Sequence, residues 1–162
     1  MRTNWVSDDN FKVILRLLTR ENSLAVECSL RYGLRIGDVL SLKRDQIAKG
    51  DFTIKEEKTG KRRRLRIKGD FQGRLLAVSG RVYVFEHRTD WRKHRTRQAV
   101  WKDIKRAAKA LRLDEIVGTH SARKNFAVGT YRVTGDMKKV QNLLNHSDEA
   151  VTMIYALADK MK

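Results

Sequence analysis

The sequence predicts a mainly α-helical domain with a small antiparallel β-sheet edge, which is an α+β fold. Three observations favour this class. Apolar residues recur at helical spacing along most of the chain, and only one region alternates apolar and polar residues as strands do. That region consists of two short runs separated by the turn-forming dipeptide Thr59-Gly60. The 162 residues include no proline and no low-complexity linker, so we expect a single domain over residues 1–162.

The N-terminal quarter of the chain is predicted to form helices. Ser7 is a favourable N-cap followed by two aspartates, which suit the positive end of a helix dipole, and this helix should extend to about Arg20. A second helix should run from about Asn22 to Gly33, because glycine readily adopts the left-handed conformation just after a helix end. A short third helix should then carry apolar residues up to Leu42 into the core.

One β-hairpin is predicted in the middle of the chain. Asp51 to Glu57 and Lys61 to Ile67 both alternate, which places Lys58 at the tip of the hairpin. The returning strand is strongly basic, and a solvated edge strand is one interpretation, since charge on an edge opposes aggregation. The density of positive charge favours a phosphate backbone alongside it. The side chains predicted to contact that backbone are Lys61, Arg62, Arg64 and Arg66.

Two helices and a short strand are predicted next. Asp70 to Val78 has the pattern of a helix, and Val82 to Phe85 that of a short strand. Arg97 to Leu111 is a strong helix, whose apolar side includes Trp101 and whose other side is basic.

The segment before that last helix is basic and polar. We expect Arg88 to Arg97 to be a mobile or DNA-facing loop, in which Arg95 and Arg97 contact DNA. His87 and His94 are expected to be surface residues.

The end of the chain should form three short helical segments. The first is capped by Thr119 or Ser121 and ended by Gly135, and the second covers residues 136–144. The third carries Tyr155.

Composition limits the function classes. The formal net charge is +17, from 36 Lys and Arg against 19 Asp and Glu, so a polyanion is the natural partner: DNA or RNA first, an anionic membrane surface second. No apolar run approaches the roughly 20 residues that span a bilayer, and the N-terminus lacks a signal-peptide core. Cys28 is the only cysteine, which fits a reducing cytoplasm. No metal-ligand spacing is present, so we expect neither a metal nor a cofactor.

Two arginines could together hold a phosphate. His120 and Arg123 lie three residues apart and so face the same side of a helix start, where free N–H groups favour anions. Arg123 adds a planar fork for two oxygens, and Arg35 could add a second. Two such forks would stabilise the extra charge of five-coordinate phosphorus without a metal.

The remaining polar residues could supply the nucleophile and the protons. Tyr155 could attack phosphorus once a base or a cationic pocket activates its hydroxyl. His120 is placed to exchange a proton. Lys58 could protonate the leaving sugar oxygen, and His146 could bind the phosphate or orient the nucleophile.

Each candidate also has a plain structural interpretation. Arg35 could cap the preceding helix or pair with Asp38. His146 could cap a helix end, and Tyr155 lies at helical spacing from Val151 and could be a core residue. The joint order of the candidates favours the catalytic interpretation over any residue taken alone.

Four short motifs in a fixed order are similar to those of a known family. The first arginine motif is GLRIGDVLSL, the lysine hairpin is KTGK, the HxxR motif is HSARKNFA, and the closing histidine–tyrosine motif is LLNHSDEAVTMIYA. With them the chain resembles the catalytic domain of the tyrosine recombinase (phage integrase) family over about residues 22–158. The resemblance implies that Tyr155 is the nucleophile and that a phosphate pocket is formed by Arg35, Lys58, His120, Arg123 and His146.

The resemblance also implies a fold and an activity. The fold is that of the tyrosine recombinase catalytic domain, also called the DNA breaking-rejoining fold. The activity is site-specific recombination or integration: metal-independent cleavage and rejoining of duplex DNA through a covalent 3′-phosphotyrosyl link, with strand exchange in a tetramer on a Holliday junction. The N-terminal DNA-clamping domain of many members is expected to be absent. Two positions depart from the family pattern, Ser121 for an aspartate and Asn145 for a glycine, and we expect them to tune geometry only.

Two other functions stay open at this point. A basic DNA-binding module without catalysis would explain the charge equally well. A topoisomerase of the related type IB would use similar chemistry as a monomer. A metal-dependent nuclease is the least favoured alternative.

Overall fold

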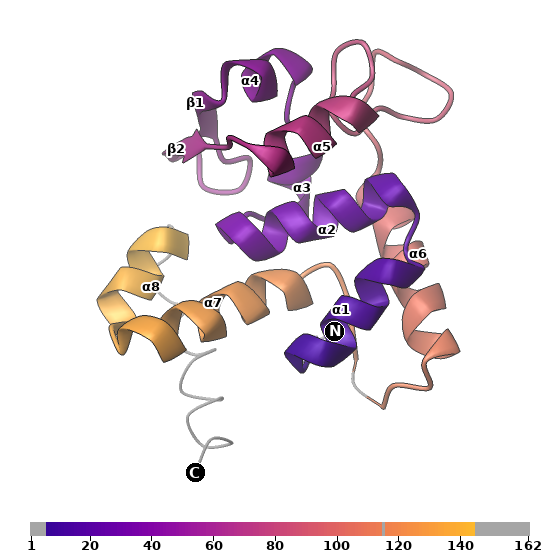
Figure 1. The fold of residues 1–162 in the computed structure, drawn as a ribbon. Coiled ribbons are helices and arrows are strands. Elements are labelled where there is room, and N and C mark those ends of the chain that lie inside the picture. Colours follow the sequence, from indigo (N-terminus) through magenta and orange to yellow (C-terminus); the bar gives the residue numbers. More distant parts are fainter. Residues whose placement is uncertain (1–5, 115, 145–162) are drawn as a thin grey trace.

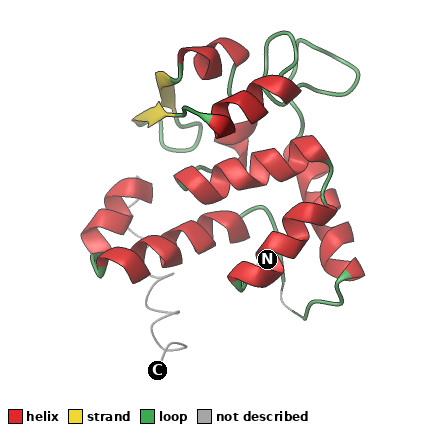
Figure 2. Cartoon of the chain, in the orientation of Figure 1, coloured by secondary structure: helices red, strands yellow, loops and turns green. Residues whose placement is uncertain are grey.

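The structure is a computed structural model in which residues 6–114 and 116–144 are described. These residues form eight helices and one two-stranded antiparallel sheet (Figures 1 and 2), which confirms the predicted class. In chain order the elements are α1 (Asp8–Leu17), α2 (Arg20–Tyr32), α3 (Ile36–Leu40), α4 (Arg44–Lys49), β1 (Asp51–Lys55), β2 (Arg62–Arg66), α5 (Asp70–Val78), α6 (Arg97–Ala110), α7 (Ser121–Thr134) and α8 (Met137–Leu144).

The first two helices follow the capping rules. Ser7 Oγ accepts a hydrogen bond from the backbone N of Asn10 at 3.3 Å. Gly33 ends α2 with φ 61°, in the left-handed region. The first helix ends at Leu17, three residues before the predicted end. The cause is Thr19, whose N–H donates to Asp103 on α6 at 2.9 Å and thereby fixes the turn between the helices.

Helix α2 is central to the described fold. It packs against α1, α3, α5 and α7. Figure 1 shows it crossing the middle of the molecule, with α5 and the hairpin on one side and α7 on the other. Cys28 lies on its buried face, and burial raises the pKa of this thiol to about 12. A smaller apolar cluster, under α7 and α8, contains Ala127, Val140 and Leu144.

The β-hairpin has the predicted strands and turn. Its register runs from Asp51 opposite Arg66 to Lys55 opposite Arg62. Phe52, Ile54 and Leu65 point into the core, whereas the residues between them face outward. The hairpin is therefore anchored by one apolar face and leaves its turn near the end of α2.

Helix α4 was not predicted. Its six residues include a single buried apolar side chain, Ile47, so the helical period does not show in the sequence. Its ends are set locally instead: the N–H of Lys43 donates to Gln46 Oε1 at 2.9 Å, and Gly50 closes the helix in the left-handed region.

Two further predictions were wrong. Val82 to Phe85 do not form a strand; Tyr83 makes one isolated bridge with Lys43, because only a short connection passes between α3 and α4 at this point. Trp101 is not on the buried side of α6, since 45% of its surface is exposed and Lys105 lies over its ring. Val100 and Ile104 supply the buried side instead.

Among the described residues, no helix is long and apolar enough to cross a membrane.

Candidate phosphate-binding site

Arg123 connects three parts of the chain that the sequence motifs had singled out. It lies on the first turn of α7, is 5% exposed, and donates from Nη1 to the carbonyl of Gly33 at 2.7 Å. Its Nη2 donates to the carbonyl of Leu144 at 2.7 Å. The guanidinium thus joins the end of α2, the start of α7 and the end of α8. Leu144 lies two residues before His146 in the sequence.

Close packing between α2 and α7 makes this connection possible. Gly33 has a positive φ, and a Cβ there would collide with the ring of Phe126 on α7. A glycine is therefore required both by the backbone conformation and by the approach of the second helix.

Arg35 follows at once and also points inward. Its side chain is 10% exposed, and its Nη1 donates to Glu56 Oε2 at 3.0 Å. Its Nη2 is buried and has no hydrogen-bond acceptor among the described residues. The alternative pairing with Asp38 is wrong, because Asp38 Oδ1 instead accepts the backbone N–H of Glu57 at 2.8 Å.

The side chains of Lys58 and His120 both lie at the surface. Lys58 is exposed at the tip of the hairpin, as predicted. His120 is exposed and occupies the N-cap position of α7, so the prediction that Thr119 or Ser121 caps this helix was wrong. The reason is that Ser121 Oγ turns back to accept the backbone N–H of Gly118 at 3.1 Å.

The site contains more buried positive groups than negative ones. Burial, and after it the positive charge of Arg35, lower the pKa of Arg123 to about 10. Burial raises the pKa of Asp38 above its ordinary value, and the nearby carboxylate of Glu56 adds to the rise. Burial also lowers the pKa of Arg63. Three guanidinium groups thus face two carboxylates, and a bound anion would relieve the repulsion between the cations.

Glu56 and Arg63 are part of the site but were not predicted. Glu56 is 1% exposed, and Arg63 lies 3.8 Å from its Oε1 and donates to the carbonyl of Tyr32 at the end of α2. A signal was present in the sequence. Alternate residues of a strand face the same side. Glu56 therefore falls on the side of the buried residues of β1, and Arg63 on the side of the buried residues of β2.

The predicted DNA-contacting residues of the hairpin lie in different surroundings. Lys61, Arg62 and Arg66 are exposed. Arg64 is exposed too, but it holds Asp51 through two hydrogen bonds of 2.8 and 2.7 Å. Three of the four positions thus present cations on the outer surface, and the fourth is part of an ion pair.

The two candidates near α6 also differ. Arg97 begins the helix and is exposed. It lies near α3, since a Cβ at Gly37 would lie 3.6 Å from its Cδ. Arg95 is drawn inward: its side chain is 22% exposed and its Nη2 lies 3.8 Å from Glu21.

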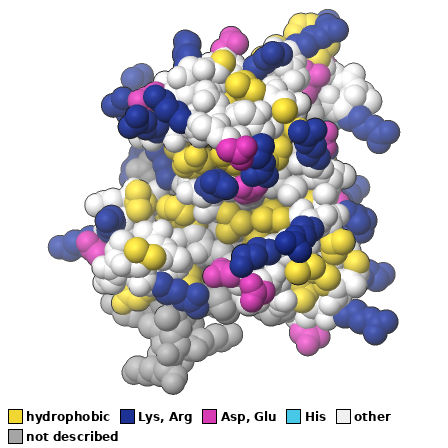
Figure 3. Space-filling view, in the orientation of Figure 1, with side chains coloured by type: hydrophobic (Ala, Val, Ile, Leu, Met, Phe, Trp, Pro, Cys, Tyr) yellow, Lys and Arg dark blue, Asp and Glu magenta, His cyan; other side chains and the backbone are white. Residues whose placement is uncertain are grey.

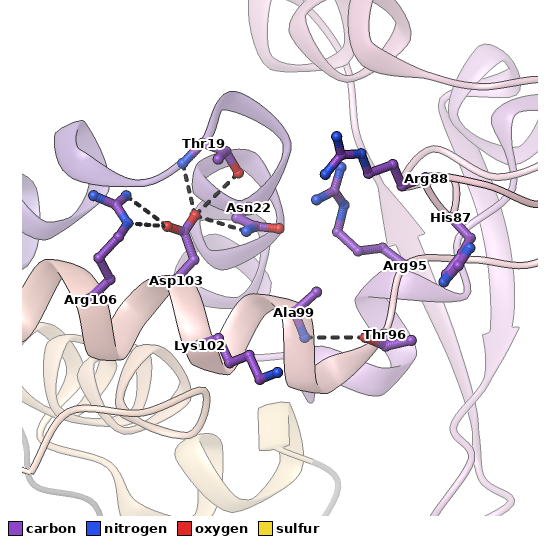
Figure 4. Close-up of a pocket in the computed structure, with 10 residues that line it drawn as sticks. All are labelled: Thr19, Asn22, His87, Arg88, Arg95, Thr96, Ala99, Lys102, Asp103 and Arg106. Atoms are coloured by element: carbon purple, nitrogen blue, oxygen red, sulfur yellow. Dashed lines mark hydrogen bonds and ion pairs between the residues drawn. The ribbon is translucent and has the colours of Figure 1, made fainter.

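Arg95 belongs to a pocket between α2, α6 and residues 87–96 (Figure 4). At one side of the pocket Asp103 accepts a hydrogen bond from Asn22 at 2.8 Å, which fixes α6 to α2, and one from Arg106 of its own helix at 2.7 Å. His87 and His94 are half-buried rather than fully exposed, and the ring of His94 meets that of Tyr83 edge-on, with 5.4 Å between the ring centroids.

His146 and Tyr155 lie outside the described residues. Within the described part of the chain, no group of three or more His, Cys, Asp or Glu side chains could hold a metal ion.

Comparison with known proteins identifies the family of this chain. The model of the phage integrase family matches residues 4–162. The chain belongs to the phage integrase family. Within this family, it is similar to the probable integrase/recombinase YoeC of Bacillus subtilis, with 31% identity over 140 residues that cover 78% of this chain and 72% of YoeC. It is also 29% identical over 143 residues to the tyrosine recombinase XerD of Lacticaseibacillus casei, covering 76% of this chain and 45% of XerD.

Solved structures confirm the predicted fold of a recombinase catalytic domain. The catalytic core of lambda integrase is similar with a TM-score of 0.73 and 21% identity, over 91% of this chain and 94% of that core. A lambda integrase tetramer bound to a Holliday junction gives a TM-score of 0.75 and 20% identity, over 94% of this chain and 48% of that one. This member of the phage integrase family thus spans about half the length of several relatives that it matches.

Proposed function

We propose that this chain is the catalytic domain of a site-specific DNA recombinase or integrase, which cleaves and rejoins duplex DNA through a 3′-phosphotyrosyl link. One observation carries the proposal. Arg35 and Arg123, from separate motifs, are buried in one charged cluster, and Nη2 of Arg35 has no acceptor among the described residues. A scissile phosphate would supply the missing acceptor and balance the excess positive charge.

The proposed reaction needs only side chains of this chain. The hydroxyl oxygen of Tyr155 attacks phosphorus, its proton passes to His120, and the bond from phosphorus to the 5′ oxygen breaks. Lys58 donates a proton to that leaving oxygen, so the products are a phosphotyrosine at the 3′ end and a free 5′ hydroxyl. Arg35, Arg123 and His146 hold the non-bridging oxygens as charge develops on them.

The stored bond energy makes the reaction reversible. A 5′ hydroxyl attacks the phosphotyrosine, the tyrosine leaves, and no ATP is consumed. If the attacking hydroxyl belongs to another duplex, strands are exchanged.

Double-stranded DNA is the proposed partner, and a tetramer the proposed assembly. The net charge of +17 and the exposed cations Lys61, Arg62, Arg66 and Arg97 support DNA binding. Similarity to a lambda integrase tetramer bound to a Holliday junction supports the assembly. The lone thiol of Cys28, fully buried, supports a cytoplasmic location.

A suicide substrate tests the proposal. A library of duplexes nicked near each possible cleavage site would trap the covalent complex, because the short 5′ fragment diffuses away before religation. We expect a complex that survives SDS and excess EDTA for the natural chain and none for Tyr155→Phe. Salt-sensitive binding without any covalent complex would favour the non-catalytic module. A covalent complex in the Tyr155→Phe variant would refute the nucleophile.

A further inference from the structure

We propose that Glu56 is a positioning residue, which couples Arg35 to the lysine turn (residues 57–60) so that both act on the same phosphate. The inference rests on the proposed function. It extends that function by assigning a role to a buried carboxylate outside the six predicted catalytic residues.

On one side, Glu56 holds the arginine. Its Oε2 accepts a hydrogen bond from Nη1 of Arg35 at 3.0 Å, and the side chain of Glu56 is fully buried. This contact fixes the plane of the guanidinium and leaves Nη2 as the donor without a described acceptor. A second guanidinium, that of Arg63, lies 3.8 Å from Oε1 of the same carboxylate.

On the other side, the same oxygen holds the lysine turn. The hydroxyl of Thr59, next to Lys58, donates to Glu56 Oε2 at 3.0 Å. The backbone of Glu56 closes the turn as well: its carbonyl accepts from the N–H of Gly60 at 2.8 Å, and its N–H donates to the carbonyl of Lys61 at 2.9 Å.

One carboxylate oxygen therefore sets the positions of two catalytic groups. In the proposed reaction Arg35 binds a non-bridging oxygen, and Lys58 must reach the leaving oxygen of the same phosphate. A misplacement of about 1 Å can slow a reaction on the order of 100-fold, so this shared anchor matters for rate. A purely structural role would instead reduce every step equally.

A change of leaving group distinguishes a role of Glu56 in positioning Lys58 from a purely structural role. A duplex whose bridging 5′ oxygen is replaced by sulfur releases a thiolate, and because a thiol has a pKa of roughly 8.5, its departure needs no proton donor. Covalent-complex formation is measured with a nicked oxygen duplex and its sulfur counterpart. For Thr59→Val we expect a loss on the order of tenfold with the oxygen duplex and a rate near that of the natural chain with the sulfur duplex.

Matched variants control this comparison. Thr59→Ser keeps the hydroxyl and should restore the rate with oxygen. Thr53→Val makes the same chemical change on the exposed face of β1 and should alter neither rate. Glu56→Gln removes the charge that anchors Arg35 and should slow both duplexes. Thermal unfolding of every variant is followed in parallel, and if Glu56→Gln does not fold, the Thr59 variants decide alone.

Several outcomes would overturn the proposal. Equal losses with oxygen and sulfur in Thr59→Val, or no loss with either, would show that the turn contact does not position Lys58. Natural rates in a folded Glu56→Gln would remove the role of Glu56 toward Arg35. Failure of the natural chain to form a covalent complex with either duplex would refute the proposed function and the inference with it. If the natural chain forms the covalent complex but Thr59→Val does not distinguish the oxygen duplex from the sulfur duplex, only the inference is refuted.

Discussion

A single buried side chain, Arg123, holds the ends of two helices against a third. Its guanidinium donates to the carbonyls of Gly33 and Leu144, both at 2.7 Å, where α2 and α8 end. Helix ends leave carbonyls without intrahelical partners, and Arg123 supplies donors to two of them. The residue is therefore expected to contribute to stability as well as to phosphate binding.

Substitution of this arginine should separate the two contributions. Arg123→Lys keeps the positive charge, but an ammonium group cannot reach both carbonyls and a phosphate in the same way. We expect cleavage to fall by roughly 100-fold or more, the free energy of unfolding to fall by about 1–3 kcal/mol, and DNA binding to persist. Covalent-complex rates, urea unfolding and a binding assay measure these effects. Arg132→Lys, on the exposed part of the same helix, is the matched control; natural cleavage by Arg123→Lys would remove Arg123 from the pocket.

The sequence predicts some residues of the site and not others. Arg35 and Arg123 were predicted because their motifs are recognisable. In the structure the two side chains are close enough for the charge of Arg35 to lower the pKa of Arg123. Glu56 and Arg63 were missed because the charges of the hairpin were interpreted as facing solvent or DNA, although each continues the alternation of buried residues in its strand. A charged residue at an inward position of a strand signals a buried ion pair, since such a charge is not stable without a partner.

At the level of elements, the contact between α2 and α7 determines whether the site forms. Gly33 ends α2 with a positive φ, and a Cβ there would meet the ring of Phe126 and, at 3.1 Å, a methyl group of Leu144. Any side chain would push α7 and α8 away from the end of α2, and would move Arg123 with them.

Two glycine substitutions test this contact. Gly33→Ala should destabilise the domain by more than about 1 kcal/mol, because it adds backbone strain to a collision. Gly129→Ala, inside α7 with open space around it, should stabilise by roughly 0.5–1 kcal/mol. Urea unfolding measures both. A neutral Gly33→Ala would contradict the close packing that brings Arg123 to α2.

Elements were predictable where their pattern is long or alternating. The hairpin and helices such as α2 and α6 have such patterns, whereas α4 has one buried apolar residue and depends on caps. Val82 to Phe85 have side chains that favour strands, but the segment forms a single bridge, between Tyr83 and Lys43. Its β-propensity therefore did not determine its structure.

The whole molecule is organised by charge. On the face drawn in Figure 3, Lys and Arg side chains project around much of the outline, with patches of Asp and Glu between them. The excess of 17 positive charges cannot be balanced within the chain, so DNA binding is expected to release counterions and to depend steeply on salt.

Two neighbouring arginines should differ in their share of this salt dependence. Arg62 is exposed on β2, whereas Arg64 holds Asp51. Arg62→Gln should reduce the slope of log affinity against log salt by about 0.9, the value for one phosphate contact. Arg64→Gln should reduce it by less. Titrations between low and moderate salt measure both slopes, and equal changes would show that the Asp51 pair does not hold Arg64 away from DNA.

At the same scale, the class of fold and the family followed from the order of the motifs along the chain. The way the chain brings them together did not, because it depends on hydrogen bonds between side chains and distant carbonyls, such as those of Arg123, which no local pattern encodes.

The central claim is that this cluster of cations activates one phosphate for attack by Tyr155. The most direct measurement is mass spectrometry of the trapped covalent complex after proteolysis and nuclease digestion. The account predicts a nucleotide joined through its 3′ phosphate to the peptide that contains Tyr155. A nucleotide joined through its 5′ phosphate, or attached to any other residue, would contradict it.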